Sequence, residues 1–169
     1  MRIEMVRVGE RYFTEVERDD GAVIRLGGPG AHGLPHDLVH YVVESELHVD
    51  RGFWGKVARG ENVWKVECVR PPSQRPRPLK HAPRGKGADV EAIVGLVHRI
   101  HGTLPERTPA AVGCYLQTSL PPAVRARAGL DAPSVLRMCR RLDDPGQRWS
   151  KLRNGGRLVL DWPPRTARV

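Results

Sequence analysis

Alternation of polar and apolar residues dominates the first part of the chain and predicts strands. Residues 2–8, 12–17 and 22–26 each follow the two-residue period of a half-buried strand. Asp-Gly at residues 20–21 separates the second run from the third and is typical of a β-hairpin turn, because glycine accepts the positive φ angle. The glycine-rich residues 27–33 then predict a flexible connector, since they lack the residue order and the lysine of a phosphate-binding loop.

A helical period of apolar residues follows further along the chain. Residues 34–49 have one broad apolar side, and residues 89–101 carry a second apolar stripe between Asp89 and a stop at Gly102. Another helix is predicted over residues 135–142. Residues 110–116 are apolar and fit either a helix or a buried strand.

The remaining patterns complete the predicted sheet. Residues 61–69 alternate as a strand, and Gly155-Gly156 between residues 149–154 and 157–162 indicates a C-terminal hairpin. Asp143-Asp144-Pro145-Gly146 predicts a turn. We therefore expect a single α+β domain over residues 1–169. Its antiparallel sheet would combine the N- and C-terminal hairpins with a middle strand, covered by two or three helices.

Residues 70–88 differ in kind from the rest of the chain. The segment RPPSQRPRPLKHAPRGKGA contains five prolines and six basic residues but no acidic residue. Proline removes backbone donors and breaks both helices and ladders. We expect a basic, proline-rich and exposed insertion or linker here.

Composition narrows the class of protein. Hydrophobic residues make up 40% of the 169 residues and charged residues 28%, which favours a globular chain over a fibrous or wholly disordered one. No apolar run approaches the roughly 18 residues that span a bilayer, and the N-terminus lacks the apolar core of a signal peptide. The three cysteines form no C-x-x-C pair. We expect reduced thiols, a cytoplasmic location and no membrane partner.

The net charge of +9 is unevenly distributed. Residues 1–69 hold 9 Lys/Arg against 12 Asp/Glu, whereas residues 120–169 hold 11 against 4. The basic regions 70–88 and 120–169 predict an anionic partner, and one hypothesis is an accessory protein that binds nucleic acid. A GC-rich genome would enrich arginine in the same way without any such partner. An alternative partner for the 70–88 segment is another protein. The residues predicted to contact nucleic acid are Arg75, Arg77, Lys80, Arg84, Lys86, Arg140 and Arg141.

The sharpest chemical feature is His36 and His40, four residues apart in the predicted 34–49 helix. Side chains at this spacing lie one turn apart on one face, so both imidazoles can bind one zinc or other divalent metal ion. Glu44 is about 12 Å along the helix from His36, so it could share an ion with His40 alone or orient that ring. The alternative is that these histidines are solvated on the polar side of the helix. A third metal ligand would come from His81, His98, His101, Asp89 or Glu91.

Residues 36–40, His-Asp-Leu-Val-His, resemble the H-E-x-x-H signature of zinc metallopeptidases. The resemblance implies that His36 and His40 bind the metal and that Asp37 acts as general base on metal-bound water. Aspartate replaces the glutamate of the signature and is one methylene shorter. We accordingly predict His36 and His40 as metal ligands, Asp37 and Glu44 as catalytic residues, and a divalent-metal or small-ligand site with hydrolytic chemistry.

The longer stretch LPHDLVHYVVESEL, followed by GFWGKVARG, resembles a set of uncharacterised small actinobacterial proteins over about residues 1–69. That resemblance implies no activity. It implies only that His36, Asp37, His40, Glu44 and residues 52–55 belong to one unit.

Overall fold

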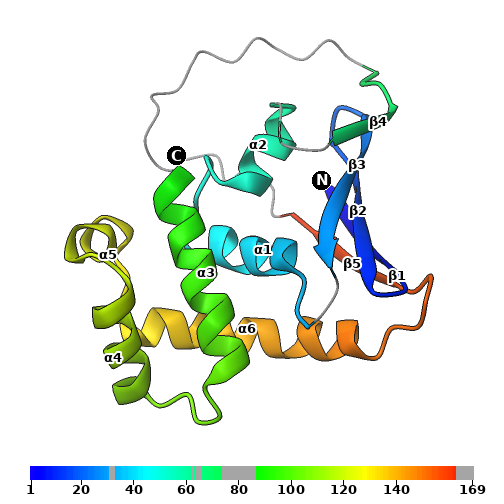
Figure 1. The fold of residues 1–169 in the computed structure, drawn as a ribbon. Helices are drawn as coiled ribbons and strands as arrows, with labels where there is room; N and C mark the ends of the chain where they lie inside the picture. Colours follow the sequence, from blue (N-terminus) through cyan, green and yellow to red (C-terminus); the bar gives the residue numbers. More distant parts are fainter. Residues whose placement is uncertain (31–32, 62, 64–65, 74–86, 163–169) are drawn as a thin grey trace.

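The computed structural model shows an α+β fold with one antiparallel sheet and a layer of helices (Figure 1). It describes residues 1–169 apart from 31–32, 62, 64–65, 74–86 and 163–169. Among the described residues, the strand order is β4-β3-β2-β1-β5, with antiparallel neighbours. The elements in chain order are β1 (Arg2–Val8), β2 (Arg11–Glu17), β3 (Val23–Gly30), α1 (His36–Glu46), α2 (Phe53–Arg59), β4 (Val66–Arg70), α3 (Gly87–Thr103), α4 (Pro109–Ser119), α5 (Pro122–Ala128), α6 (Ala132–Ser150) and β5 (Arg157–Asp161).

The N-terminal strands confirm the predicted hairpin around Asp20-Gly21. Strands β2 and β3 pair from Glu17 opposite Val23, and Gly21 adopts a φ of +79° in the turn between them. The predicted connector at residues 27–33 is partly wrong, because β3 continues to Gly30. Gly28 lies directly over the ring of Tyr12, where a side chain would not fit, so glycine here permits close packing of the strand.

The prediction of a C-terminal hairpin is wrong, although residues 157–161 form a strand. Residues up to Ser150 belong to the long helix α6, and β5 instead pairs with β1, with Ile3 opposite Leu160. The predicted turn at Asp143–Gly146 likewise lies inside α6. The helix continues because its buried side chains keep a helical period as far as Trp149, which packs edge-on against Tyr12 with ring centroids 5.7 Å apart.

Strand β4 contains residues 66–69 of the strand predicted over residues 61–69, of which 62 and 64–65 lie outside the described residues, and it forms one edge of the sheet. All five of its residues are exposed. The three cysteines are free thiols: Cys68 on β4 and Cys114 on α4 are exposed, whereas Cys139 on α6 is buried.

Helices α1, α3 and α6 contact one another and form the centre of the helical layer (Figure 1). They share one hydrophobic core with the buried residues of the sheet, among them Ile3, Met5, Val16 and Leu158. The undecided residues 110–116 lie in helix α4, and helix α5 was not predicted. Among the described residues, no helix is long enough and apolar enough to cross a membrane.

Candidate metal centre

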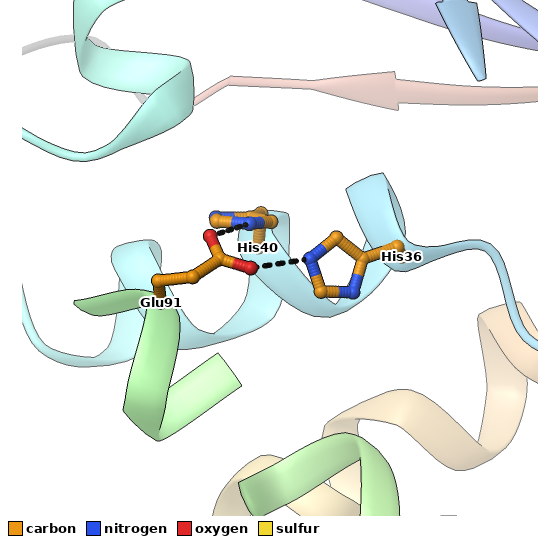
Figure 2. A group of neighbouring side chains, drawn as sticks. All are labelled: His36, His40 and Glu91. Atoms are coloured by element: carbon orange, nitrogen blue, oxygen red, sulfur yellow. Dashed lines mark hydrogen bonds and ion pairs between the residues drawn. The ribbon is translucent and has the colours of Figure 1, made fainter. Parts of the chain in front are cut away.

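The site lies where α3 crosses the N-terminal half of α1. His36 begins α1 and His40 follows one turn later, so their imidazoles meet edge to face with centroids 4.8 Å apart. Glu91 reaches them from the second turn of α3 (Figure 2). Its Oε1 lies 2.9 Å from Nε2 of His36, and its Oε2 lies 3.1 Å from Nε2 of His40.

These three residues offer one donor atom each, and the donor atoms all lie within 4.8 Å of one another. Donors about 2.1 Å from a tetrahedral zinc ion are about 3.4 Å apart, so modest side-chain rotation closes the group around an ion. The carboxylate of Glu91 has that freedom because its side chain is 61% exposed, whereas the side chain of His40 is only 8% exposed. The group is therefore fixed at His40 and open to solvent at Glu91, and the side chain of His36 is 32% exposed.

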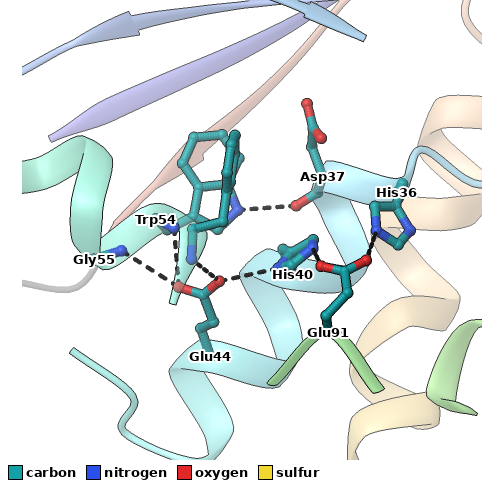
Figure 3. A network of polar contacts seen from close by, with 8 residues as sticks. His36, Asp37, His40, Glu44, Trp54, Gly55 and Glu91 are labelled. Carbon is teal, nitrogen blue, oxygen red and sulfur yellow. Dashed lines mark hydrogen bonds and ion pairs between the residues drawn. The ribbon is translucent and has the colours of Figure 1, made fainter. Parts of the chain in front are cut away.

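His40 is held in place by Glu44, one turn further along α1. Its Nδ1 lies 3.0 Å from Oε1 of Glu44, so its Nε2 faces the other way, toward Glu91 (Figure 3). The side chain of Glu44 is completely buried. A carboxylate on the far nitrogen of a histidine is the usual outer partner of a metal-bound imidazole.

Glu44 is itself held by the start of α2. The backbone N–H groups of Phe53, Trp54 and Gly55 donate to its carboxylate at 2.6, 2.9 and 3.3 Å. Gly52 lies so close to this carboxylate that a Cβ atom would fall 2.1 Å from its carbon. The four residues Gly-Phe-Trp-Gly thus form a cradle for one buried side chain, and Figure 3 shows Trp54 and Gly55 at the Glu44 carboxylate.

The carboxylate of Asp37 points away from Glu91 (Figure 3). Thr14 of β2 donates a hydrogen bond to the Asp37 carboxylate at 3.1 Å, and Trp54 Nε1 donates to the backbone oxygen of Asp37 at 2.9 Å. Burial raises the pKa of Asp37, and the Thr14 hydrogen bond opposes that rise. Burial, followed by the nearby Asp37 charge, raises the pKa of Tyr12 above its usual range. The structure therefore places Asp37 with the sheet and not with the group of donor atoms.

The polar side predicted for the 34–49 helix is buried in the structure at three residues and is not solvated there. Asp37, His40 and Glu44 are all buried, with 9%, 6% and 0% of their surface exposed. The helix is also shorter than predicted, because it ends at Glu46. A helical period describes one helix alone. Here α2, α3 and the sheet surround α1, so its polar side is covered as well.

The other proposed ligands lie outside the group. The ring of His98 is 6.0 Å from that of His36, and burial, then His36 and His101, lowers the pKa of His98. Nε2 of His101 lies 3.1 Å from the carboxylate of Asp143. His81 lies outside the described residues. Among the residues that the structure describes, the group therefore contains neither His98 nor His101.

The two acidic residues proposed as a third ligand, Asp89 and Glu91, have different partners. Asp89 accepts hydrogen bonds from Arg127 of α5, whereas Glu91 joins the histidines. Both acidic residues lie next to Val90, whose buried side chain belongs to the face of α3 in the core, so the sequence did not separate them. The choice depends on the crossing of α3 over α1, which is a tertiary relationship.

The residues predicted to contact nucleic acid are not brought together by any described contact. Arg75, Arg77, Lys80, Arg84 and Lys86 lie outside the described residues. On α6, Arg141 donates to Glu46 at 2.8 Å and to Ser45 at 3.1 Å, and Arg140 is exposed. Nucleic-acid binding stays a prediction from composition.

Comparison of the chain with family models, with curated proteins and with solved structures gave no match.

Proposed function

We propose that this protein binds one divalent metal ion, with zinc as the best fit, through His36, His40 and Glu91, and that the ion activates water for hydrolysis. The observation that carries the proposal is the convergence of three donor atoms from two helices within 4.8 Å. Two imidazoles and one carboxylate are a ligand set that catalytic zinc uses.

The number of ligands sets the chemistry. Tetrahedral zinc with three protein ligands keeps a fourth position for water, and the ion lowers the pKa of that water to about 7. Glu91, at 61% exposure, leaves the site open on its own side, which gives a substrate a route of approach. In this proposal Asp37 has a structural role. The location of the protein in the cytoplasm stays a prediction.

Two further observations support a metal over a simple ion pair. Glu44 holds His40 by Nδ1, which leaves Nε2 as the ligand atom. His36 presents its own Nε2 to the same carboxylate. The predominance of nitrogen ligands favours zinc, iron, nickel or copper over magnesium or calcium, which prefer oxygen.

Metal analysis of the protein without a histidine tag tests the proposal. We expect about one equivalent of metal per chain by elemental analysis after zinc loading and dialysis, and an affinity at least about 100-fold lower in His40→Ala and in His36→Ala/Glu91→Gln. His48→Asn is the matched control. His48 is exposed just beyond α1, and asparagine tolerates its φ of +50°.

Failure of the wild-type protein to retain or titrate any of zinc, cobalt, nickel or iron would overturn the proposal. The contacts of Glu91 with His36 and His40 would then be ion pairs between two helices. Equal metal loss in the control variant would have the same consequence, because the metal would then be bound elsewhere.

A further inference from the structure

A completely buried carboxylate lies directly behind His40. Glu44 has no exposed surface, yet it makes four polar contacts: three with backbone N–H groups and one with Nδ1 of His40. Burying a carboxylate is costly unless such partners compensate it. The Glu44 carboxylate is therefore accommodated in the core because these donors surround it.

The contact orients the imidazole. A carboxylate only accepts, so Nδ1–H of His40 donates to Glu44, and Nε2 is the nitrogen left for an ion at the place where Glu91 and His36 converge. Fixing the proton on one nitrogen also fixes which nitrogen can bind a metal. The ring of Phe53, 5.5 Å from that of His40, packs beside it.

The partner of Glu44 is a separate element. Helix α2 supplies the three N–H donors. A further hydrogen bond joins α2 to α1, because Trp54 Nε1 donates to the backbone oxygen of Asp37. Gly52 has a φ of −74° and a ψ of −169°, which any residue can adopt. Glycine at this position is required only because Glu44 occupies the space of a Cβ atom.

We propose that Glu44 is a positioning residue for the metal ligand His40, and that the docking of α2 through Gly52–Gly55 sets the metal affinity of the site. This inference rests on the proposed function. By linkage, metal binding must stabilise the docked α2 by the same factor by which docked α2 strengthens metal binding. Residues 52–55 thus belong to the metal centre without touching the ion.

Two variants separate this role from general stability. Gly52→Ala forces the Glu44 carboxylate to move while leaving every ligand unchanged, and Glu44→Gln removes its charge in place. We expect each to weaken zinc binding about 10- to 100-fold, measured by competition with a chromophoric chelator. Gly95→Ala is the control, because a Cβ atom on that α3 glycine meets no atom within 4 Å. Its affinity should stay within about twofold of the wild type.

Two measurements on the zinc-loaded wild type need no variant. Long-range ¹H–¹⁵N spectra should show His40 bound through Nε2, with a slowly exchanging Nδ1–H. Amide hydrogen exchange at Phe53, Trp54 and Gly55 should slow on addition of zinc and return on chelation. These measurements decide the matter if a variant fails to fold.

Coordination of His40 through Nδ1, or zinc affinities of G52A and E44Q equal to that of G95A, would overturn the inference while leaving the metal site in place. Amide hydrogen exchange at residues 53–55 that does not change on addition of zinc would also overturn the inference. A wild-type chain that binds no zinc would instead overturn the proposed function, and the inference with it.

Discussion

Oε2 of Glu91 lies 3.1 Å from Nε2 of His40, so a single contact joins an exposed side chain of α3 to a buried imidazole of α1. A metal ion at this point would bridge the same two helices with stronger bonds. Zinc should therefore stabilise the folded chain, by about 2.7 kcal/mol at a free concentration 100 times its dissociation constant. Thermal melting with and without zinc measures this.

Glu91→Gln provides the control for that stabilisation. Without metal its unfolding free energy should change by less than about 1 kcal/mol, because an ion pair with one exposed partner contributes little. With zinc the variant should show no rise in melting temperature. A rise equal to that of the wild type would show that Glu91 is not a ligand.

Asp37 gives a prediction about stability. Thr14→Val removes the hydroxyl that donates to its buried carboxylate, and we expect a loss of about 1–3 kcal/mol in urea unfolding. Asp37→Asn should bind zinc as tightly as the wild type, since the carboxylate points away from the donor group. Tenfold weaker zinc binding in Asp37→Asn would contradict this placement.

Gly28 gives a prediction about packing. A Cβ atom there would lie 2.5 Å from the ring of Tyr12, which is only 3% exposed and packs against Trp149. We expect Gly28→Ala to cost about 1–3 kcal/mol, as overpacking does in a close-packed core. Gly27→Ala is the control, because a Cβ atom there meets nothing within 4 Å. Equal effects of the two substitutions would refute the packing argument.

Glu46 at the end of α1 makes the free energy of unfolding depend on pH in the acidic range. The hydrogen bond from Arg137 of α6, with a further one from Arg141, holds the pKa of Glu46 below its ordinary value of 4.5. Because the folded pKa is depressed, the stabilisation is present above about pH 4.5 and is lost as the pH falls through the folded pKa. Denaturant unfolding between pH 6 and pH 3 should show this loss.

The size of the stabilisation by Glu46 follows from the exposure of its two arginine partners. Glu46 is 17% exposed, but Arg137 and Arg141 are 56% and 44% exposed, so solvent screens the pair and we expect only about 0.3–1 kcal/mol. Glu46→Gln should flatten the acid dependence by that amount, whereas Glu106→Gln, an exposed position between α3 and α4, should leave it unchanged. A slope unaltered by Glu46→Gln would show that other carboxylates govern it.

Local patterns predicted most elements of the fold, and the errors have identifiable causes. The Asp20-Gly21 hairpin followed from turn chemistry, and α3 followed from its apolar stripe. The C-terminal hairpin failed because Gly155-Gly156 joins a helix to a strand and not two strands. Pairing of β5 with β1 is non-local, and no short-range signal carries it.

The site was predictable only in part. Spacing alone brought His36 and His40 to one face of a helix, which is a local property. It could not choose Glu91 among five alternatives, because that choice depends on how α3 crosses α1. It also left Glu44 between a ligand and an orienting role, and the cradle formed by residues 52–55 shows why its carboxylate faces inward.

Strand β1 lies inside the sheet, between β2 and β5, although β5 is formed only by residues 157–161. During synthesis on the ribosome, one side of β1 therefore has no partner until residues 157–161 have emerged. Such distant pairing is slow to form and leaves a strand edge exposed to other nascent chains. Truncations that remove β5 should accordingly yield aggregates rather than a smaller folded protein.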